Sequence, residues 1–367
     1  MASRDPETIK RVESEDLPEV AAAFGIGTIE RTDFLPSGLM NLNWRVAGSR
    51  ATAAVKRLVD VDRQQAARSL DLLGFLADTG IPVPSPLATA AGEPVVAVGD
   101  GYYCAVPWVD GEHIPGRDLS TAQAAQLGSV LGRIHRALGR AAAKAGLEPP
   151  IGDLVAKVSD PEAVDGSMHR FLDVIAALPE REPFDADAAD TLHRRRELLA
   201  RHRAQRPATD RPLVPAGWTH GDFQPLNLLW NENTVAAVLD WDRVAFRPYG
   251  EEIVRSANYL FPAADGRALD LERIAAFVTA YRTEVPQFTR ADGDDAVERM
   301  WWRRLTDLWH LEFRYDRGDT SCDHLYGASC LVLEWWTERR ELVREAFAAG
   351  GLGEAGEFFF LEGALPR

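Results

Sequence analysis

Three side chains whose oxygen atoms can bind a metal ion or a proton, Asp222, Asn227 and Asp240, fall within residues 220–242, which read HGDFQPLNLLWNENTVAAVLDWD. Proteins usually bind magnesium through one or two carboxylate or carboxamide oxygens, together with phosphate oxygens of a substrate and water. Asn227 and Asp240 suit that role. Phosphoryl transfer needs one more carboxylate, which accepts the proton of the attacking hydroxyl group and orients it. Asp222 is left for that task, so the segment predicts a magnesium-dependent phosphoryl transfer site.

A β-hairpin would bring these side chains together. Residues 226–230 and 235–239 are short apolar runs, and the polar residues 231–234 between them are typical of a turn that joins two strands. In such a hairpin Asn227 lies near Asp240 at the open end, and the loop that leads in carries the third acid. The competing interpretation is a polar loop beside an ordinary hairpin. The agreement of several spacings favours the site.

The motif resembles the signature of a known family. Residues 220–227 (HGDFQPLN) and 239–242 (LDWD) are similar to the HGDxxxxN and DWD signatures of the aminoglycoside phosphotransferase and choline kinase-like family. This resemblance implies a protein kinase-like fold with ATP as the phosphoryl donor. In the motif, Gly221 permits a tight turn of the loop, and His220 can hold the loop through a ring hydrogen bond.

The resemblance also implies a phosphate-binding loop and a lysine near the N-terminus. Residues 37–41 (SGLMN) lie where the family carries a short Gly-x-x-Asn loop, so Ser37, Gly38 and Asn41 are expected to approach the nucleotide. Lys56 matches the lysine that kinases place on the α and β phosphates of ATP. The helix expected after it offers no Glu, which leaves the acidic partner of this lysine open.

A third implied element is the segment that contacts adenine. Residues 102–111 (YYCAVPWVDG) resemble the hinge between the two lobes of such kinases. Pro107 has no N–H group, so the backbone donor to adenine must come from Val106, Trp108 or Val109.

The apolar pattern predicts an α+β fold with two lobes, of which residues 1–106 form the N-lobe. Residues 30–57 are expected to form two antiparallel strands, and residues 63–79 a helix that ends at a glycine. A second hairpin is expected from residues 93–98 and 102–106. The N-lobe would then be a small sheet with one helix.

Residues 107–367 are expected to form a mainly helical C-lobe, whose only strands are the hairpin within residues 226–240. His135 ends an LGRIH segment similar to the family's LGxxxH motif, and we interpret it as a packing and hydrogen-bonding residue. Long helices are expected at residues 119–138, 184–204, 269–284, 295–314 and 324–349.

The composition is that of an ordinary globular enzyme and argues against some partners. The 367 residues carry a net charge of −15, whereas nucleic acids and anionic membranes require a basic surface. The N-terminus is charged and the chain has no long apolar run, so we expect no signal segment, no membrane span and a cytoplasmic location. Three cysteines are too few for a disulfide framework.

The sequence therefore predicts an ATP- and Mg²⁺-dependent kinase for a hydroxyl group of a small molecule. Asp242 would support the loop or reach the metal through water. The acceptor could be an aminoglycoside-like antibiotic, or homoserine, choline, methylthioribose or a sugar; a nucleotide-binding pseudokinase would have no chemical need for the base, the lysine and both ligands. The acidic balance favours an amino-bearing acceptor. It would lie against a cluster near the C-terminus: Trp301, Trp302, Asp307, Trp309, His310, Glu312 and Asp316.

Overall fold

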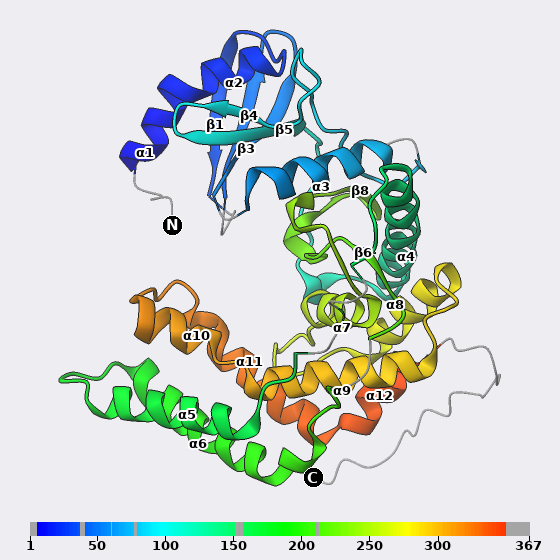
Figure 1. Cartoon of the computed structure of the whole chain (residues 1–367). Coiled ribbons are helices and arrows are strands. Elements are labelled where there is room, and N and C mark those ends of the chain that lie inside the picture. Colours follow the sequence, from blue (N-terminus) through cyan, green and yellow to red (C-terminus); the bar gives the residue numbers. More distant parts are fainter. Residues whose placement is uncertain are drawn as a thin grey trace.

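The computed structural model describes residues 6–36, 41–59, 61–76, 79–150, 154, 157–209 and 213–349 of the chain. Figure 1 shows a small lobe built on a sheet and a larger lobe built mainly of helices, which is the α+β architecture expected from the sequence. In the described part of the chain, no helix combines the length and apolar character needed to cross a bilayer.

The sheet of the N-lobe is antiparallel, with the strand order β1-β2-β3-β5-β4. The predicted hairpin is present as β4 and β5, but residues 30–57 contain three strands and not two. A turn in which the Gly48 N–H donates to the Ala51 carbonyl (2.9 Å) separates the second strand from the third. The strands are β1 (Ile29–Leu35), β2 (Leu42–Gly48), β3 (Thr52–Leu58), β4 (Val96–Val98) and β5 (Gly101–Pro107).

The prediction of a single helix in this lobe was wrong. Helices α1 (Pro6–Arg11) and α2 (Leu17–Ala23), joined by a π-helical turn (Val12–Asp16), precede the sheet. Apolar residues of α2 and of the π-helical turn are interspersed with charged ones, yet they are buried in a core shared with β2, β3 and β5, whereas α1 buries none of its residues. The helix expected at residues 63–79 is present as α3 (Arg63–Leu76).

The helices of the C-lobe agree with the prediction in part. Those expected at residues 119–138, 184–204 and 269–284 are present as α4, α6 and α8, whereas α5 and α7 were not predicted. The helix expected at residues 324–349 divides at Arg339 into α11 and α12. The bounds are α4 (Thr121–Lys144), α5 (Pro161–Ala176), α6 (Pro183–His202), α7 (Tyr249–Leu260), α8 (Leu271–Glu284), α9 (Arg290–Thr306), α10 (Trp309–Leu311), α11 (Asp323–Glu338) and α12 (Arg340–Ala348).

The helix expected at residues 295–314 is interrupted, and its polar contacts explain why. Helix α9 ends at Thr306, and the next residue, Asp307, has an extended backbone (φ −85°, ψ 123°). The Asp307 carboxylate accepts a hydrogen bond from the Trp309 N–H (3.2 Å), which favours a turn over a continued helix. The buried Arg195 side chain donates to carbonyl oxygens at the end of α9 and so satisfies groups that the helix leaves unpaired.

Two short antiparallel strand pairs lie in the C-lobe, β6 with β9 and β7 with β8. The second pair is the predicted hairpin; the first was not predicted. Because Thr219 pairs with Ala245, the loop that carries Asp222 leaves the β6–β9 pair at the same end at which the segment that carries Asp240 enters it. The strands are β6 (Ala216–Thr219), β7 (Leu228–Asn231), β8 (Thr234–Val238) and β9 (Ala245–Pro248).

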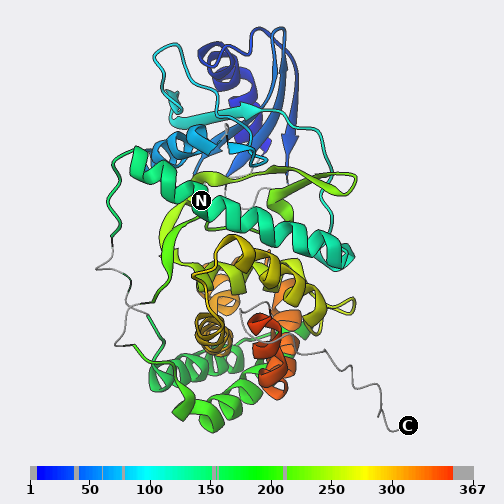
Figure 2. The same cartoon turned by 90° about the vertical axis from the view of Figure 1, so that its right-hand side faces the viewer.

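One large core cluster joins the C-lobe helices to α3 and to the hairpin. Figure 2 shows the long helix α4 running between the N-lobe and the remaining helices. Helices α4 and α8 approach so closely that a Cβ atom at Gly128 would clash with the Phe277 carbonyl oxygen. Trp301 and Trp302 are fully buried in this core. The division of the lobes at residue 106 stays a prediction.

Candidate active site

The loop that carries Asp222 is held in one conformation by its own residues. His220 is fully buried; its Nδ1 accepts a hydrogen bond from the Asp222 N–H (3.1 Å), so its Nε2 carries the proton and donates to the Leu239 carbonyl (2.9 Å). Gly221 has φ +87°, and a Cβ atom there would clash with the Arg243 carbonyl oxygen. The loop thus depends on both residues, as the sequence suggested.

Glu252 on α7 holds the same loop through hydrogen bonds, and the sequence did not identify it as a residue of the site. Its buried carboxylate accepts hydrogen bonds from the backbone N–H groups of His220 (3.1 Å) and Gly221, and it pairs with Nε2 of His135 (2.6 Å). Burial alone would raise the pKa of Glu252, but the hydrogen bond and charge of His135 outweigh it and hold that pKa below 4.5. His135 also contacts the Tyr281 hydroxyl (2.8 Å), in keeping with its interpretation as a packing and hydrogen-bonding residue.

Asp222 and Asn227 lie in direct contact. The Asn227 side-chain amide donates to the backbone carbonyl (2.8 Å) and to the carboxylate Oδ2 (3.0 Å) of Asp222. This orientation turns the Asn227 amide nitrogen towards Asp222 and leaves its oxygen as the atom suited to a cation. The Leu239 N–H donates to the backbone carbonyl oxygen of Asn227 (2.8 Å). This bond fixes Leu239, the residue before Asp240, beside Asn227.

Arg255 is a second residue of the site that sequence analysis missed. Its Nη2 donates to Oδ1 of Asp222 at 2.6 Å, while Gln224 donates to Oδ2 at 3.0 Å. The Asp222 side chain is 13% exposed, so solvent competes little with these contacts. Arg255 is 33 residues after Asp222 in the sequence, and the packing of α7 beside the loop brings the two side chains together.

Lys56 has two acidic partners, which answers the question that the sequence left open. Its Nζ contacts Oδ1 of Asp240 and lies 3.1 Å from Oδ2 of Asp242. The Asn41 side chain donates to the same Oδ2 (3.0 Å). Burial alone would raise the pKa of Asp240, but Lys56 outweighs it and lowers that pKa, whereas burial raises the pKa of Asp242. Asp240 is therefore the more readily ionised of the two acids.

Four other residues were expected at the nucleotide: Ser37, Gly38, Val106 and Trp108. Ser37 and Gly38 lie outside the described residues. Val106 is in β5, next to the connection between the lobes. The Trp108 N–H already donates to the Thr52 carbonyl (3.0 Å) and Val106 pairs with Ala54 in the sheet, so Val109 remains as the candidate backbone donor to adenine.

The C-terminal cluster predicted from the sequence does not form a single acceptor surface. Trp301 and Trp302 are core residues, and Trp309 stacks on His310 with ring centroids 3.7 Å apart. Asp316 is held by two hydrogen bonds from an arginine on α5, Arg170 (2.7 and 3.0 Å).

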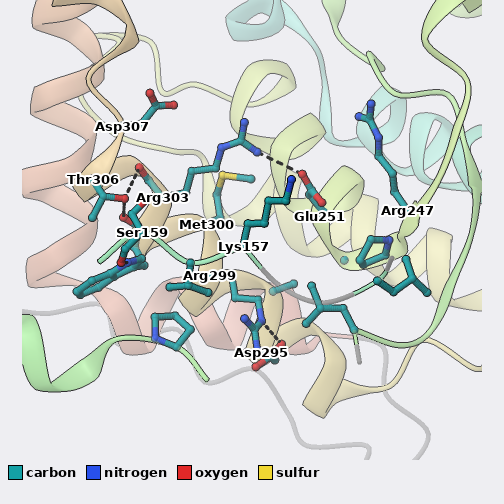
Figure 3. A pocket seen from close by; sticks show the side chains of 18 of the residues that line it. Lys157, Ser159, Arg247, Glu251, Asp295, Arg299, Met300, Arg303, Thr306 and Asp307 are labelled. Carbon is teal, nitrogen blue, oxygen red and sulfur yellow. Dashed lines mark hydrogen bonds and ion pairs between the residues drawn. The ribbon is translucent and has the colours of Figure 1, made fainter. Parts of the chain in front are cut away.

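Asp307 and Glu312, the other two acids of that cluster, line a cavity of about 900 Å³ between the start of α5, β9, α7 and α9. Figure 3 shows Arg303 of α9 reaching Glu251 of α7 in this cavity. The two side chains form an ion pair with an N–O distance of 3.2 Å. Glu251 lines the cavity and is four residues before Arg255, the residue that contacts Asp222. The two positions are therefore about 6 Å apart along the axis of α7.

Comparisons with known proteins agree with this geometry. A family model described as "Phosphotransferase enzyme family" matches residues 32–288, more than half of the chain. The homoserine kinase of Methylobacillus flagellatus is 25% identical over 316 residues, which cover 81% of this chain and 86% of the relative. The homoserine kinase of Methylobacillus glycogenes is 26% identical over 308 residues, with the same coverage.

Solved structures show the same fold. An amicoumacin kinase in complex with AMP-PNP, Ca²⁺ and Ami superposes with a TM-score of 0.55 and 16% identity, over 95% of this chain and 98% of the other. An aminoglycoside phosphotransferase from Alicyclobacillus acidocaldarius gives 0.53 and 17%, over 95% of both chains. The two-lobed architecture is therefore protein kinase-like, as the resemblance of the motif implied.

Proposed function

This chain belongs to the phosphotransferase enzyme family, and from that premise we propose that it transfers the γ-phosphoryl group of ATP, with Mg²⁺, to the hydroxyl group of a small hydroxy amino acid of the homoserine type. It is a small-molecule kinase whose acceptor group is a hydroxyl. The observation that carries the proposed chemistry is the convergence of Asp222, Asn227, Asp240 and Lys56 at the open ends of two strand pairs.

Asp222 is the proposed base. Its carboxylate would accept the proton of the acceptor hydroxyl as the oxygen forms its bond to the γ-phosphorus and the bond to the ADP oxygen breaks. The contacts from Arg255, Gln224 and Asn227 fix the orientation of that carboxylate before the acceptor arrives. A fixed orientation lowers the barrier because no reorganisation is needed during transfer.

Asn227 and Asp240 are the proposed ligands of Mg²⁺, and their chemistry fits that ion. The Asn227 amide nitrogen is engaged with Asp222, which leaves its oxygen available, and the pKa of Asp240 is lowered, so its carboxylate is charged at neutral pH. Among the described residues, His, Cys, Asp and Glu side chains form no group of three that could hold a metal by themselves. This agrees with an open site that phosphate oxygens complete. Bound Mg²⁺ would neutralise charge on the transferred phosphoryl group.

Lys56 is proposed to hold the α and β phosphates of ATP. In the structure its ammonium group is paired with Asp240 and Asp242. Asp240 and Asp242, of which Asp242 is also held by Asn41, would thus position the Lys56 ammonium group beside the metal site, where it could bind phosphate oxygens.

The acceptor class is supported by the curated relatives. Both homoserine kinases align over 81% of the chain. An antibiotic-sized acceptor is the second candidate, because the cavity of about 900 Å³ beside α7 is in the size range of drug-binding sites.

The test is an acceptor screen with the purified protein, ATP and Mg²⁺, in which ADP release and the mass of the product are measured. Homoserine and related amino alcohols form one set, and aminoglycosides and other antibiotics form the other. We expect acceptor-dependent ADP release and a phosphorylated product in the first set. ATP binding without phosphorylation of any hydroxyl compound would contradict the proposal.

A further inference from the structure

Helix α7 contacts Asp222 through Arg255 and also meets a second arginine, Arg304 of α9; of these two side chains the proposed chemistry uses only the contact of Arg255 with Asp222. Arg255 of α7 is stacked over the ring of Tyr259, 4.9 Å from its centroid. Arg304 of α9 donates from Nε to the side-chain oxygen of Asn258, the residue before Tyr259 (3.1 Å). Asn258 is three residues after Arg255 on α7, so Arg304 contacts this helix within one turn of Arg255.

Arg304 has no carboxylate partner. None of the carboxylates in the described part of the chain forms an ion pair with it, and burial lowers its pKa. Its neighbour Arg195 lowers the pKa of Arg304 further and is itself occupied by backbone carbonyls, whereas Asp307, which forms no ion pair with Arg304, raises that pKa. Burial together with Arg195 and Arg304 lowers the pKa of His310 to about 4. A partly buried guanidinium in such surroundings is stabilised when an anion binds it.

Arg255 is incompletely paired as well. Its Nη2 donates to Asp222, but its Nη1 is buried without any hydrogen-bond partner. Arginine carries five N–H donors in a planar arrangement that matches the two oxygens of a carboxylate. A buried donor without an acceptor is unfavourable, so an incoming oxygen at this position would be favoured.

We infer that Arg255 and Arg304 bind an anionic group of the acceptor, so that this kinase acts on hydroxy acids and not on purely cationic alcohols. The inference rests on the proposed function of Asp222, since the hydroxyl must reach that carboxylate while the anionic group reaches the guanidinium groups. The acceptor would then carry an anionic group besides the amino group expected from the sequence, and recognition of that amino group by Asp307, Glu312 and Asp316 stays a prediction.

The experiment compares two acceptors that differ in one group. L-Homoserine carries a carboxylate, and the corresponding amino diol carries a CH₂OH group in its place. The kcat/KM of the wild-type enzyme should be on the order of 10- to 100-fold higher for homoserine, which corresponds to one or two charge-assisted hydrogen bonds. Equal kcat/KM values for the two compounds would overturn the inference while leaving the kinase assignment intact.

Variants of Arg304 test whether this residue causes the preference in kcat/KM for homoserine over the amino diol. Arg304→Met should lower kcat/KM for homoserine by a similar factor, leave that for the amino diol nearly unchanged and spare the KM for ATP; Arg304→Lys should restore part of the loss. Arg290→Met is the matched control, because Arg290 is an exposed arginine at the start of the same helix. A loss of the same size for both acceptors would reduce Arg304 to a structural role and overturn the inference.

The stability of the Arg304→Met variant and the outcome in which an acceptor is not phosphorylated complete the test. Because Arg304→Met removes a charge that lacks an anionic partner, the variant should unfold at the same or a higher denaturant concentration than the wild type. Phosphorylation of neither compound, at concentrations where ATP binds, would overturn both the inference and the proposed homoserine-type acceptor. Phosphorylation of the amino diol alone would overturn only the anion site.

Discussion

Glu252 is the residue whose substitution most directly tests how the catalytic loop is held. Its carboxylate accepts hydrogen bonds from the backbone N–H groups of His220 (3.1 Å) and Gly221 and pairs with His135 (2.6 Å). In Glu252→Gln the side chain keeps its size, but one oxygen becomes an NH₂ group that faces N–H donors. At least one charge-assisted hydrogen bond is therefore lost in a buried position.

The expected loss follows from these contacts. One charge-assisted hydrogen bond contributes about 1.5–3 kcal/mol, and a buried donor left unpaired is unfavourable by about 1–3 kcal/mol. The two contributions overlap, so Glu252→Gln should lower the free energy of unfolding by about 3 kcal/mol, measured by urea denaturation followed by tryptophan fluorescence. The matched control is Glu251→Gln. Its carboxylate is 41% exposed and pairs with Arg303 at 3.2 Å, so its loss should stay below about 1 kcal/mol.

The pH dependence of this difference is also predicted. The pKa of Glu252 in the folded protein lies below its ordinary value of 4.5, so its stabilisation is fully present above pH 4.5 and is lost as the pH falls through the lower folded-state pKa. The stability gap between the wild type and Glu252→Gln should therefore narrow at acidic pH. Equal losses in Glu252→Gln and Glu251→Gln at neutral pH would refute the role of Glu252 as a brace.

Three further predictions concern the metal, the nucleotide and the loop. Asp240→Asn should raise the Mg²⁺ concentration for half-maximal rate far more than Asp242→Asn does; the opposite ranking in a titration would mean that the two acids are assigned the wrong way round. Lys56→Met should raise the KM for ATP by on the order of tenfold or more, since a charge-assisted contact to phosphate is lost; an unchanged KM would remove Lys56 from the nucleotide site. Gly221→Ala should lower the free energy of unfolding by about 2 kcal/mol or more, because alanine is strained at φ +87° and meets the Arg243 carbonyl. A free energy of unfolding for Gly221→Ala equal to that of the wild type would contradict the close approach of Gly221 to the Arg243 carbonyl.

Local patterns in the sequence predicted the parts of the site that are close together along the chain. The hairpin at residues 228–238 has a polar turn between apolar runs, and the spacing of Asn227 and Asp240 around it follows from strand geometry. The β6–β9 pair was missed because its two strands are short and are separated by the whole motif. Pairing of that kind depends on packing, which periodicity does not reveal.

Glu252 and Arg255 show a second limit of sequence reasoning. Both lie on α7, a helix of twelve residues that was not predicted, and their partners are about thirty residues earlier in the chain. An acid next to Ile253 and Val254 was a usable signal, since a carboxylate on the buried face of a helix requires hydrogen-bond donors. The position of those donors could be known only from the fold.

The central claim is that Asp222 acts as the base of a phosphoryl transfer, and Asp222→Asn tests it most directly. The change keeps the shape of the side chain and removes its ability to accept a proton. The measurement is kcat with the acceptor found in the screen, together with the dissociation constant of ATP in the presence of Mg²⁺. The account predicts that kcat falls by about 10²- to 10⁴-fold while ATP affinity changes little. Near-normal turnover in the folded variant would contradict it.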